Sequence, residues 1–138
     1  MIAAQRALFA PLLGFVALAF ATGLSILLTR FVDLARRRPG AAFYEDYAGG
    51  GPIGVQRTTR QLANQFEFPV LFLTAMSLAI SIRVNDSMLP ALAWAYVAMR
   101  WGHAIVHVGH NRLWLRTPVF IGSNLVLLTL WIRLAMIA

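Results

Sequence analysis

The sequence predicts an all-α integral membrane protein, built as a four-helix bundle. The first observation is composition: the chain has 138 residues, is 59% hydrophobic and has a mean hydropathy of +0.69. That is too apolar for a soluble domain of this size. The second is that four segments reach the roughly 20 largely apolar residues that a spanning helix needs. We expect one domain, 1–138, with helices at about 7–29, 62–82, 88–109 and 118–137.

The first apolar segment resembles a signal peptide at its start. Arg6 precedes the apolar run, and Ala19-Phe20-Ala21 is similar to a cleavage site. The run continues to Arg30, however, and is long enough to cross a bilayer. We therefore expect a retained helix.

Proline and turn residues shape the other three segments. Pro69 removes a backbone hydrogen bond inside the second segment, which predicts a kink near residues 64–66. The run from Val84 to Ser87 predicts a tight turn, so that the second and third helices are antiparallel neighbours. Pro118 suits an early position of the fourth helix.

Arginine supplies all the basic charge, because the chain contains no lysine, and the net charge is +7. The arginines cluster at helix ends, a pattern that topology explains better than nucleic-acid binding. Most lie in the first and third connections, and fewer lie on the other side: Arg30, Arg36, Arg37, Arg38, Arg57, Arg60, Arg112 and Arg116 against Arg6, Arg83 and Arg133. For four spans, the positive-inside rule therefore predicts that these two connections lie in the cytoplasm and both termini lie outside.

Two polar stripes interrupt the apolar segments. Arg60, Asn64 and Glu67 share one helix face, and a second stripe follows the same logic: Arg100, His103 and His107. Ionisable groups inside membrane helices are costly and usually face a partner or a water-filled cavity. We expect Glu67 to pair with Arg100, although such a pair alone could be purely structural. The full set predicts a cationic, half-buried pocket that opens to the cytoplasm and suits a small anion.

Metal and thiol chemistry receive little support from the residues. His103, His107 and His110 could share one face, but no second helix supplies a histidine and neighbouring arginines oppose a cation. We predict no metal site, and keep a haem or metal protein as the third hypothesis. Because cysteine is absent, a substrate must supply any reactive sulfur.

These motifs resemble those of the MAPEG family, the membrane-associated proteins of eicosanoid and glutathione metabolism. Arg60-x-x-x-Asn64-x-x-Glu67 is similar to the family's hallmark early in its second helix. Arg100-x-x-His103-x-x-x-His107, with Arg112 and Arg116-Thr117 after it, is similar to the third-helix region of its prostaglandin-synthase branch. The resemblance covers nearly the whole chain and suggests a bacterial-type member.

The resemblance implies a homotrimer in membrane lipid, with glutathione as co-substrate in a cleft between subunits and a hydrophobic electrophile as the second substrate. Arg116 matches the arginine that stabilises the glutathione thiolate. The implied glutathione-binding residues are Arg30, Arg60, Asn64, Glu67, Arg100, His103, His107 and Arg112. His107 and Phe120 stand where relatives carry tyrosine, which argues against prostaglandin synthesis.

The expected function is therefore glutathione-dependent transfer to, or peroxidase action on, hydrophobic electrophiles. A thiolate stabilised by arginine would be the nucleophile. The alternative is a non-catalytic MAPEG-like membrane protein that binds a small anion or a partner helix. The residues do not distinguish conjugation from peroxidase or isomerase activity.

Overall fold

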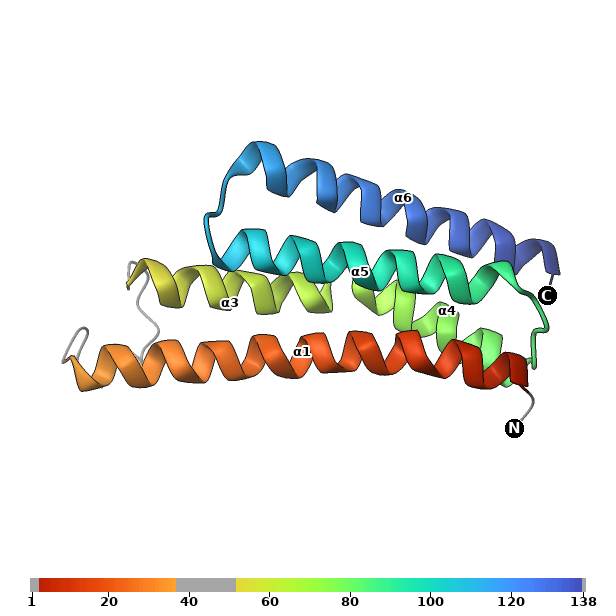
Figure 1. Cartoon of the computed structure of the whole chain (residues 1–138), viewed down its shortest axis with the longest axis horizontal. Helices are drawn as coiled ribbons and strands as arrows, with labels where there is room; N and C mark the ends of the chain where they lie inside the picture. Colours follow the sequence, from red (N-terminus) through yellow and green to blue (C-terminus); the bar gives the residue numbers. More distant parts are fainter. Residues whose placement is uncertain (1–2, 37–51, 138) are drawn as a thin grey trace.

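A computed structural model describes residues 3–36 and 52–137 and shows an elongated helical bundle (Figure 1). Its elements are α1 (Ala3–Ala35), α3 (Ile53–Phe66), α4 (Pro69–Ser81), α5 (Met88–Val108) and α6 (Leu113–Ile137). Helices α3 and α4 follow one another as a single interrupted rod, so the bundle has four rods. Helix α1 begins, and α6 ends, at the same end of the bundle. The predicted all-α four-helix architecture is confirmed.

Three of the four rods are longer than the predicted spans, and the second of them begins at Ile53 rather than at about residue 62. Helix α1 extends through Ala35, and α6 begins at Leu113, so that Pro118 lies inside α6 rather than at its start. The prediction stopped at the first charged residues because these mark the edge of the apolar run. A helix does not have to end there, since its backbone bonds are satisfied within the segment even where its side chains reach water.

The second rod is broken at Glu67 and Phe68, which confirms the predicted kink one residue beyond its expected position. Pro69 lacks an N–H and cannot donate to the carbonyl one turn earlier. Glu67 leaves the helical region with φ −88° and ψ −110°. The chain restarts through short-range bonds, from Val70 N–H to the Glu67 carbonyl at 3.2 Å and from Leu71 N–H to the Phe68 carbonyl at 3.0 Å.

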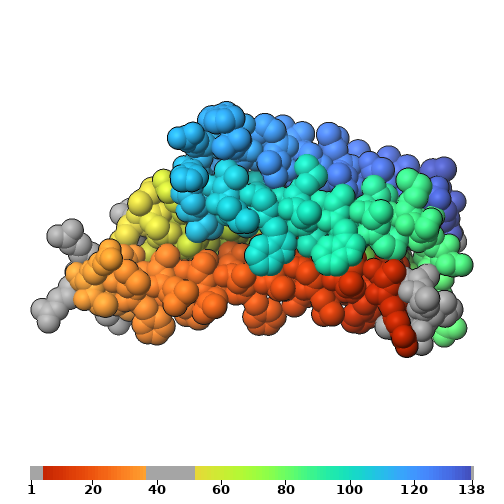
Figure 2. Space-filling view, in the orientation of Figure 1, coloured from red at the N-terminus to blue at the C-terminus, as the bar shows by residue number. Residues whose placement is uncertain are grey.

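An aromatic cluster holds three helices together at the centre of the bundle. Phe72 of α4 stacks on Tyr96 of α5 with ring centroids 4.6 Å apart, and Phe15 of α1 lies 5.6 Å from Phe72. Trp101 of α5 donates its indole N–H to the Gly14 carbonyl of α1 at 3.1 Å. Space filling shows α1 and α5 packed side by side along this face (Figure 2). Burial of these large rings supplies much of the apolar contact between the helices.

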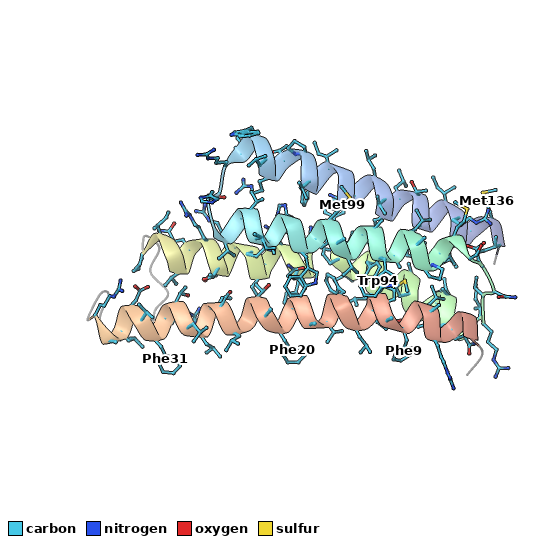
Figure 3. The ribbon with its side chains drawn as sticks, viewed as in Figure 1. Phe9, Phe20, Phe31, Trp94, Met99 and Met136 are labelled. Carbon is cyan, nitrogen blue, oxygen red and sulfur yellow. The ribbon has the colours of Figure 1, made fainter. Side chains whose placement is uncertain are left out.

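The outside of the bundle is also apolar, as in a protein that meets lipid. Phe9, Phe20 and Phe31 project from α1 away from the other helices (Figure 3), and Phe20 is 76% exposed. Three segments are long and apolar enough to cross a membrane: Gln5–Ala35, Ile53–Ser81 and Leu113–Ile137. The protein is therefore an integral membrane protein. Helix α5 is 21 residues long but carries the polar stripe of Arg100, His103 and His107, so the fourth span remains a prediction.

The turn before α5 is tied to the end of α6 by one carboxylate. Asp86 Oδ1 accepts hydrogen bonds from the backbone N–H groups of Met88 at 2.9 Å and Leu89 at 2.8 Å, and these bonds cap the helix. Asp86 Oδ2 accepts a hydrogen bond from Arg133 Nη2 at 2.7 Å, and this is the one ion pair found among the described residues. The hydrogen bond from Arg133 holds the pKa of Asp86 below its usual value.

We predict that Asp86→Ala lowers the free energy of unfolding at neutral pH. Loss of the helix cap should account for about 1 kcal/mol, and loss of the ion pair adds to it. Asp86→Asn keeps a capping oxygen and should cost less. Because the folded pKa of Asp86 is lowered, its stabilisation is present above the unfolded pKa and is lost as pH falls through the folded pKa. Thermal unfolding in mild detergent across acidic pH measures this. A wild-type acid dependence that persists unchanged in Asp86→Asn would contradict it.

Candidate functional site

A polar cavity of about 410 Å³ lies between α3, α5 and α6. It is near the end of the bundle where α3 begins and α5 turns into α6. The cavity is lined by Arg60, Ala63, Asn64, Glu67, His103, His107, Arg116, Thr117 and Phe120. Six of these residues were predicted from the two stripes and the Arg116 motif. The structure therefore brings the separate motifs around one space.

The α3 wall presents Arg60, Asn64 and Glu67 on successive turns. Arg60 and Glu67 have exposed side chains, whereas Asn64 is half-buried between them. A cation and an anion thus stand about 10 Å apart along the helix, since seven residues separate them at 1.5 Å each. This wall offers opposite charges at its two ends to whatever occupies the cavity.

The predicted ion pair between Glu67 and Arg100 does not form. Arg100 is fully buried beneath the cavity and its Nη2 donates to the backbone carbonyl of Asn64 at 2.8 Å. Glu67 lies in the break before Pro69, where its side chain turns outward into an exposed position. The prediction matched the two residues by their depth along the helices, but Arg100 lies inside the bundle while Glu67 stays on the exposed wall of the cavity.

The α5 wall consists of two buried imidazoles. His103 and His107 are 2% and 3% exposed, and their ring centroids are 5.7 Å apart. Both ring nitrogens of His103 are buried without a partner among the described residues, as is Nδ1 of His107. Buried polar atoms without partners are rare in folded proteins. They mark this wall as a place where a ligand or water would make hydrogen bonds.

No metal centre is formed by the described residues. Among residues 3–36 and 52–137, no group of three histidine, cysteine or acidic side chains is placed to hold an ion. His110 is exposed and does not line the cavity. The two histidines that do line it face arginines rather than further ligands.

The α6 wall carries Arg116, the fourth residue of that helix. Its Nη1 donates to Asn111 Oδ1 at 2.7 Å. Asn111 adopts a left-handed backbone with φ 49°, and its N–H reaches the Val106 carbonyl at 2.7 Å. The turn between α5 and α6 therefore orients the Arg116 guanidinium at the cavity.

Sequence reasoning missed two contributors to this site. Asn111 was not singled out, although an asparagine two residues beyond Gly109 is a recognisable turn signal. Arg57 was counted only as a topology signal, yet its Nη1 donates to the Gly109 carbonyl at 2.8 Å and ties α3 to the end of α5. Both residues act by joining elements, which no spacing along one helix reveals.

Three predicted site residues lie outside the cavity. Arg100 is beneath it, Arg112 is exposed just before α6, and Arg30 is half-buried near the end of α1. None of the three lines the cavity of the single chain, so their predicted contact with glutathione stays a prediction.

Comparison with known proteins gives one match. The family model described as the MAPEG family matches residues 12–136, which is nearly the whole chain. No curated protein and no solved structure matches it.

We predict that Glu67→Gln changes the free energy of unfolding by no more than about 0.5 kcal/mol, as for an exposed side chain without special contacts. Arg100→Ala should cost about 2 kcal/mol or more, because it removes a charged hydrogen bond and leaves a cavity. Thermal unfolding of the two purified variants in one detergent gives the comparison. Equal losses for the two variants would restore the ion-pair interpretation.

Proposed function

Because the chain belongs to the MAPEG family, we propose that it is a membrane-embedded glutathione transferase or peroxidase acting on hydrophobic electrophiles. One observation carries this proposal: a single cavity at the end of an apolar bundle is surrounded by two arginines, one glutamate and two histidines, and the histidines have buried ring nitrogens without partners among the described residues. A family that includes both catalytic and non-catalytic members leaves the alternative of a protein that only binds a small anion or a partner helix.

The charges of the cavity complement those of glutathione, which carries two carboxylates and one ammonium group. Arg60 is suited to a carboxylate, because a guanidinium binds a carboxylate through two parallel hydrogen bonds. Glu67 is suited to the ammonium group, and Asn64 lies between the two charges. The volume of about 410 Å³ is in the range of small-molecule sites.

Arg116 is the residue best placed to activate the thiol. A nearby guanidinium favours the thiolate over the thiol, whose ordinary pKa is about 8.5. The position of Arg116 in the first turns of α6 adds the partial positive charge of a helix N-terminus. The thiolate sulfur would then form a bond to an electrophilic carbon while a leaving group departs with its electron pair, or while an activated alkene takes up a proton.

The proposal includes a homotrimer with the site between subunits. Arg60 and Glu67 are exposed at the cavity in the single chain, which is consistent with a neighbouring subunit closing it. The cavity lies toward the bundle end where α1 ends, α3 begins and α5 turns into α6, the end predicted to face the cytoplasm. Glutathione would enter there, and the hydrophobic substrate would enter from the lipid.

The decisive variant is Arg116→Ala, with Arg112→Ala as a matched control because Arg112 is exposed and does not line the cavity. We expect turnover of a generic electrophile to fall about 100-fold in Arg116→Ala, as when one anion-stabilising donor is removed. Glutathione affinity should change much less, since other groups would hold the carboxylates. The ultraviolet absorbance of bound thiolate near neutral pH should disappear.

Two other outcomes would change the assignment of Arg116 or of the activity. Unchanged turnover in correctly folded Arg116→Ala would remove this residue from the mechanism. Glutathione binding without turnover in the wild type would favour the non-catalytic alternative. Calorimetry in detergent and stopped-flow spectroscopy supply the two measurements.

Native mass spectrometry in mild detergent tests the assembly. We expect a trimer whose glutathione occupancy is lost when the subunits separate, because part of the site would come from a neighbour. A monomer that retains glutathione would exclude the site between subunits.

A further inference from the structure

Formation of a thiolate in the cavity releases one proton, and the arginines of the cavity cannot accept it. A guanidinium is already protonated and has no acceptor atom, which excludes Arg60 and Arg116. Asn64 and Thr117 also line the cavity, but an amide and a hydroxyl are not bases near neutral pH. The proton must therefore pass to another side chain of the cavity or to water.

Three side chains of the cavity lining can accept a proton: Glu67, His103 and His107. Glu67 is the proposed partner of the ammonium group of glutathione, and a carboxylate held by an ammonium group is a poor proton acceptor. Imidazole is the side chain whose proton affinity suits transfer near neutral pH. The α5 wall, which carries both histidines, is therefore the better place to look for the acceptor.

The four imidazole nitrogens of this wall differ in accessibility. Both ring nitrogens of His103, and Nδ1 of His107, are buried with almost no accessible surface. His107 Nε2 is not among these buried atoms, and no hydrogen bond joins it to the described residues. Because His107 lines the cavity, its Nε2 is the imidazole nitrogen that a ligand can reach.

His107 and Arg116 lie at the same end of the cavity. His107 is in the last turn of α5 and Arg116 is the fourth residue of α6, on either side of the turn that joins these helices (Figure 1). The charged residues that act most strongly on the His107 ring are all cationic: Arg116, Arg60 and Arg57. The same cations favour the thiolate that remains after a thiol loses its proton.

We propose that His107 accepts the thiol proton at Nε2 and returns it to the product, so that the site favours conjugate addition. This inference rests on the proposed function. The S–H bond breaks, its electron pair stays on sulfur, and the proton forms an Nε2–H bond on an imidazole that already carries hydrogen on Nδ1. Arg116 stabilises the sulfur anion, and His107 holds the proton as an imidazolium.

The second half of the reaction uses the stored proton. The thiolate forms a C–S bond at the β-carbon of an α,β-unsaturated carbonyl compound, and the alkene electron pair moves toward the carbonyl as an enolate. The imidazolium then transfers its proton to the α-carbon, which restores the neutral ring. In a substitution reaction the leaving group departs as an anion and no carbon has to be protonated. A retained proton therefore assists addition and not substitution.

Two variants separate this role from a general effect of the α5 wall. His107→Gln keeps a polar side chain of similar length but removes the base. His103→Gln is the matched control, because His103 lies one turn earlier on the same helix and both of its ring nitrogens are buried. Thermal unfolding in detergent confirms that each variant is folded before it is used.

The first experiment counts protons and requires no turnover. Glutathione is added to purified protein in weakly buffered detergent solution near neutral pH. An indicator dye reports released protons, and ultraviolet absorbance reports the bound thiolate. Wild type should release far less than one proton per thiolate, since His107 retains it. His107→Gln should release about one proton per thiolate or lose the thiolate with glutathione still bound, and His103→Gln should match wild type in this ratio.

The result for wild type can overturn the inference without any variant. Release of one proton for each thiolate formed would show that water, and not His107, receives the proton. A proton count and thiolate signal in His107→Gln equal to those of wild type would have the same consequence. Either result leaves the proposed function intact, whereas failure of wild type to bind glutathione would overturn the proposed function and this inference with it.

The second experiment compares two reaction classes in the same protein preparations. Addition is measured with trans-4-phenyl-3-buten-2-one and substitution with 1-chloro-2,4-dinitrobenzene, each as kcat/KM. In His107→Gln the ratio of addition to substitution should fall about 100-fold, at the lower end of the effect of a positioned acid or base. His103→Gln should keep the wild-type ratio. Equal losses for both electrophiles in His107→Gln would exclude return of the proton by His107.

Discussion

Pro69 has no backbone N–H, and the interruption that follows from this organises the functional end of the molecule. A continuous helix from Ile53 to Ser81 would carry Glu67 and Phe68 on its regular surface. With the break, Glu67 follows the end of α3 on the wall of the polar cavity, and the next residue, Phe68, lines a separate apolar groove between α4 and α6. The same interruption lets α4 pack its Phe72 into the aromatic centre while α3 carries polar residues. One missing donor therefore separates a polar half-rod from an apolar one.

Helices α3 and α5 keep several polar groups away from water. Gln61, Gln65 and Arg100 are almost fully buried, and side-chain atoms of all three have no partner among the described residues. Arg100 still donates one bond, to the Asn64 carbonyl. Unpaired buried groups lower stability, and none of these three residues lines the polar cavity, so a ligand there would not satisfy them directly. The aromatic cluster one turn away provides the apolar contacts that offset this loss.

The two ends of the bundle are held in different ways. At the end far from the cavity, Asp86 joins the start of α5 to Arg133 of α6 through a helix cap and an ion pair. At the cavity end, the acceptors are neutral oxygens: Arg57 donates to the Gly109 carbonyl, and Arg116 donates to the Asn111 side-chain oxygen. An arginine bound to a neutral oxygen keeps its full charge for an anion, whereas an arginine paired with a carboxylate does not. The cavity end thus remains cationic.

The sequence by itself determined the class of the protein, the number of helical rods and the identity of most cavity residues. These properties depend on composition and on spacing along single helices, which are local. Arg60, Asn64 and Glu67 must share a face wherever their helix lies, and the family match over residues 12–136 agrees with that pattern. Helix lengths were underestimated, because charge marks the end of an apolar span and not the end of a helix.

Only the tertiary structure decided which stripe residues meet. It placed Arg100 on a backbone carbonyl instead of Glu67, gave Arg116 an asparagine partner from the preceding turn, and set Phe68 against Phe120. Each of these contacts joins two elements whose relative rotation and depth depend on the packing of the whole bundle. Periodicity specifies the face of a helix on which a residue lies, but the partner of that face is settled by side-chain volumes and by the break at Pro69.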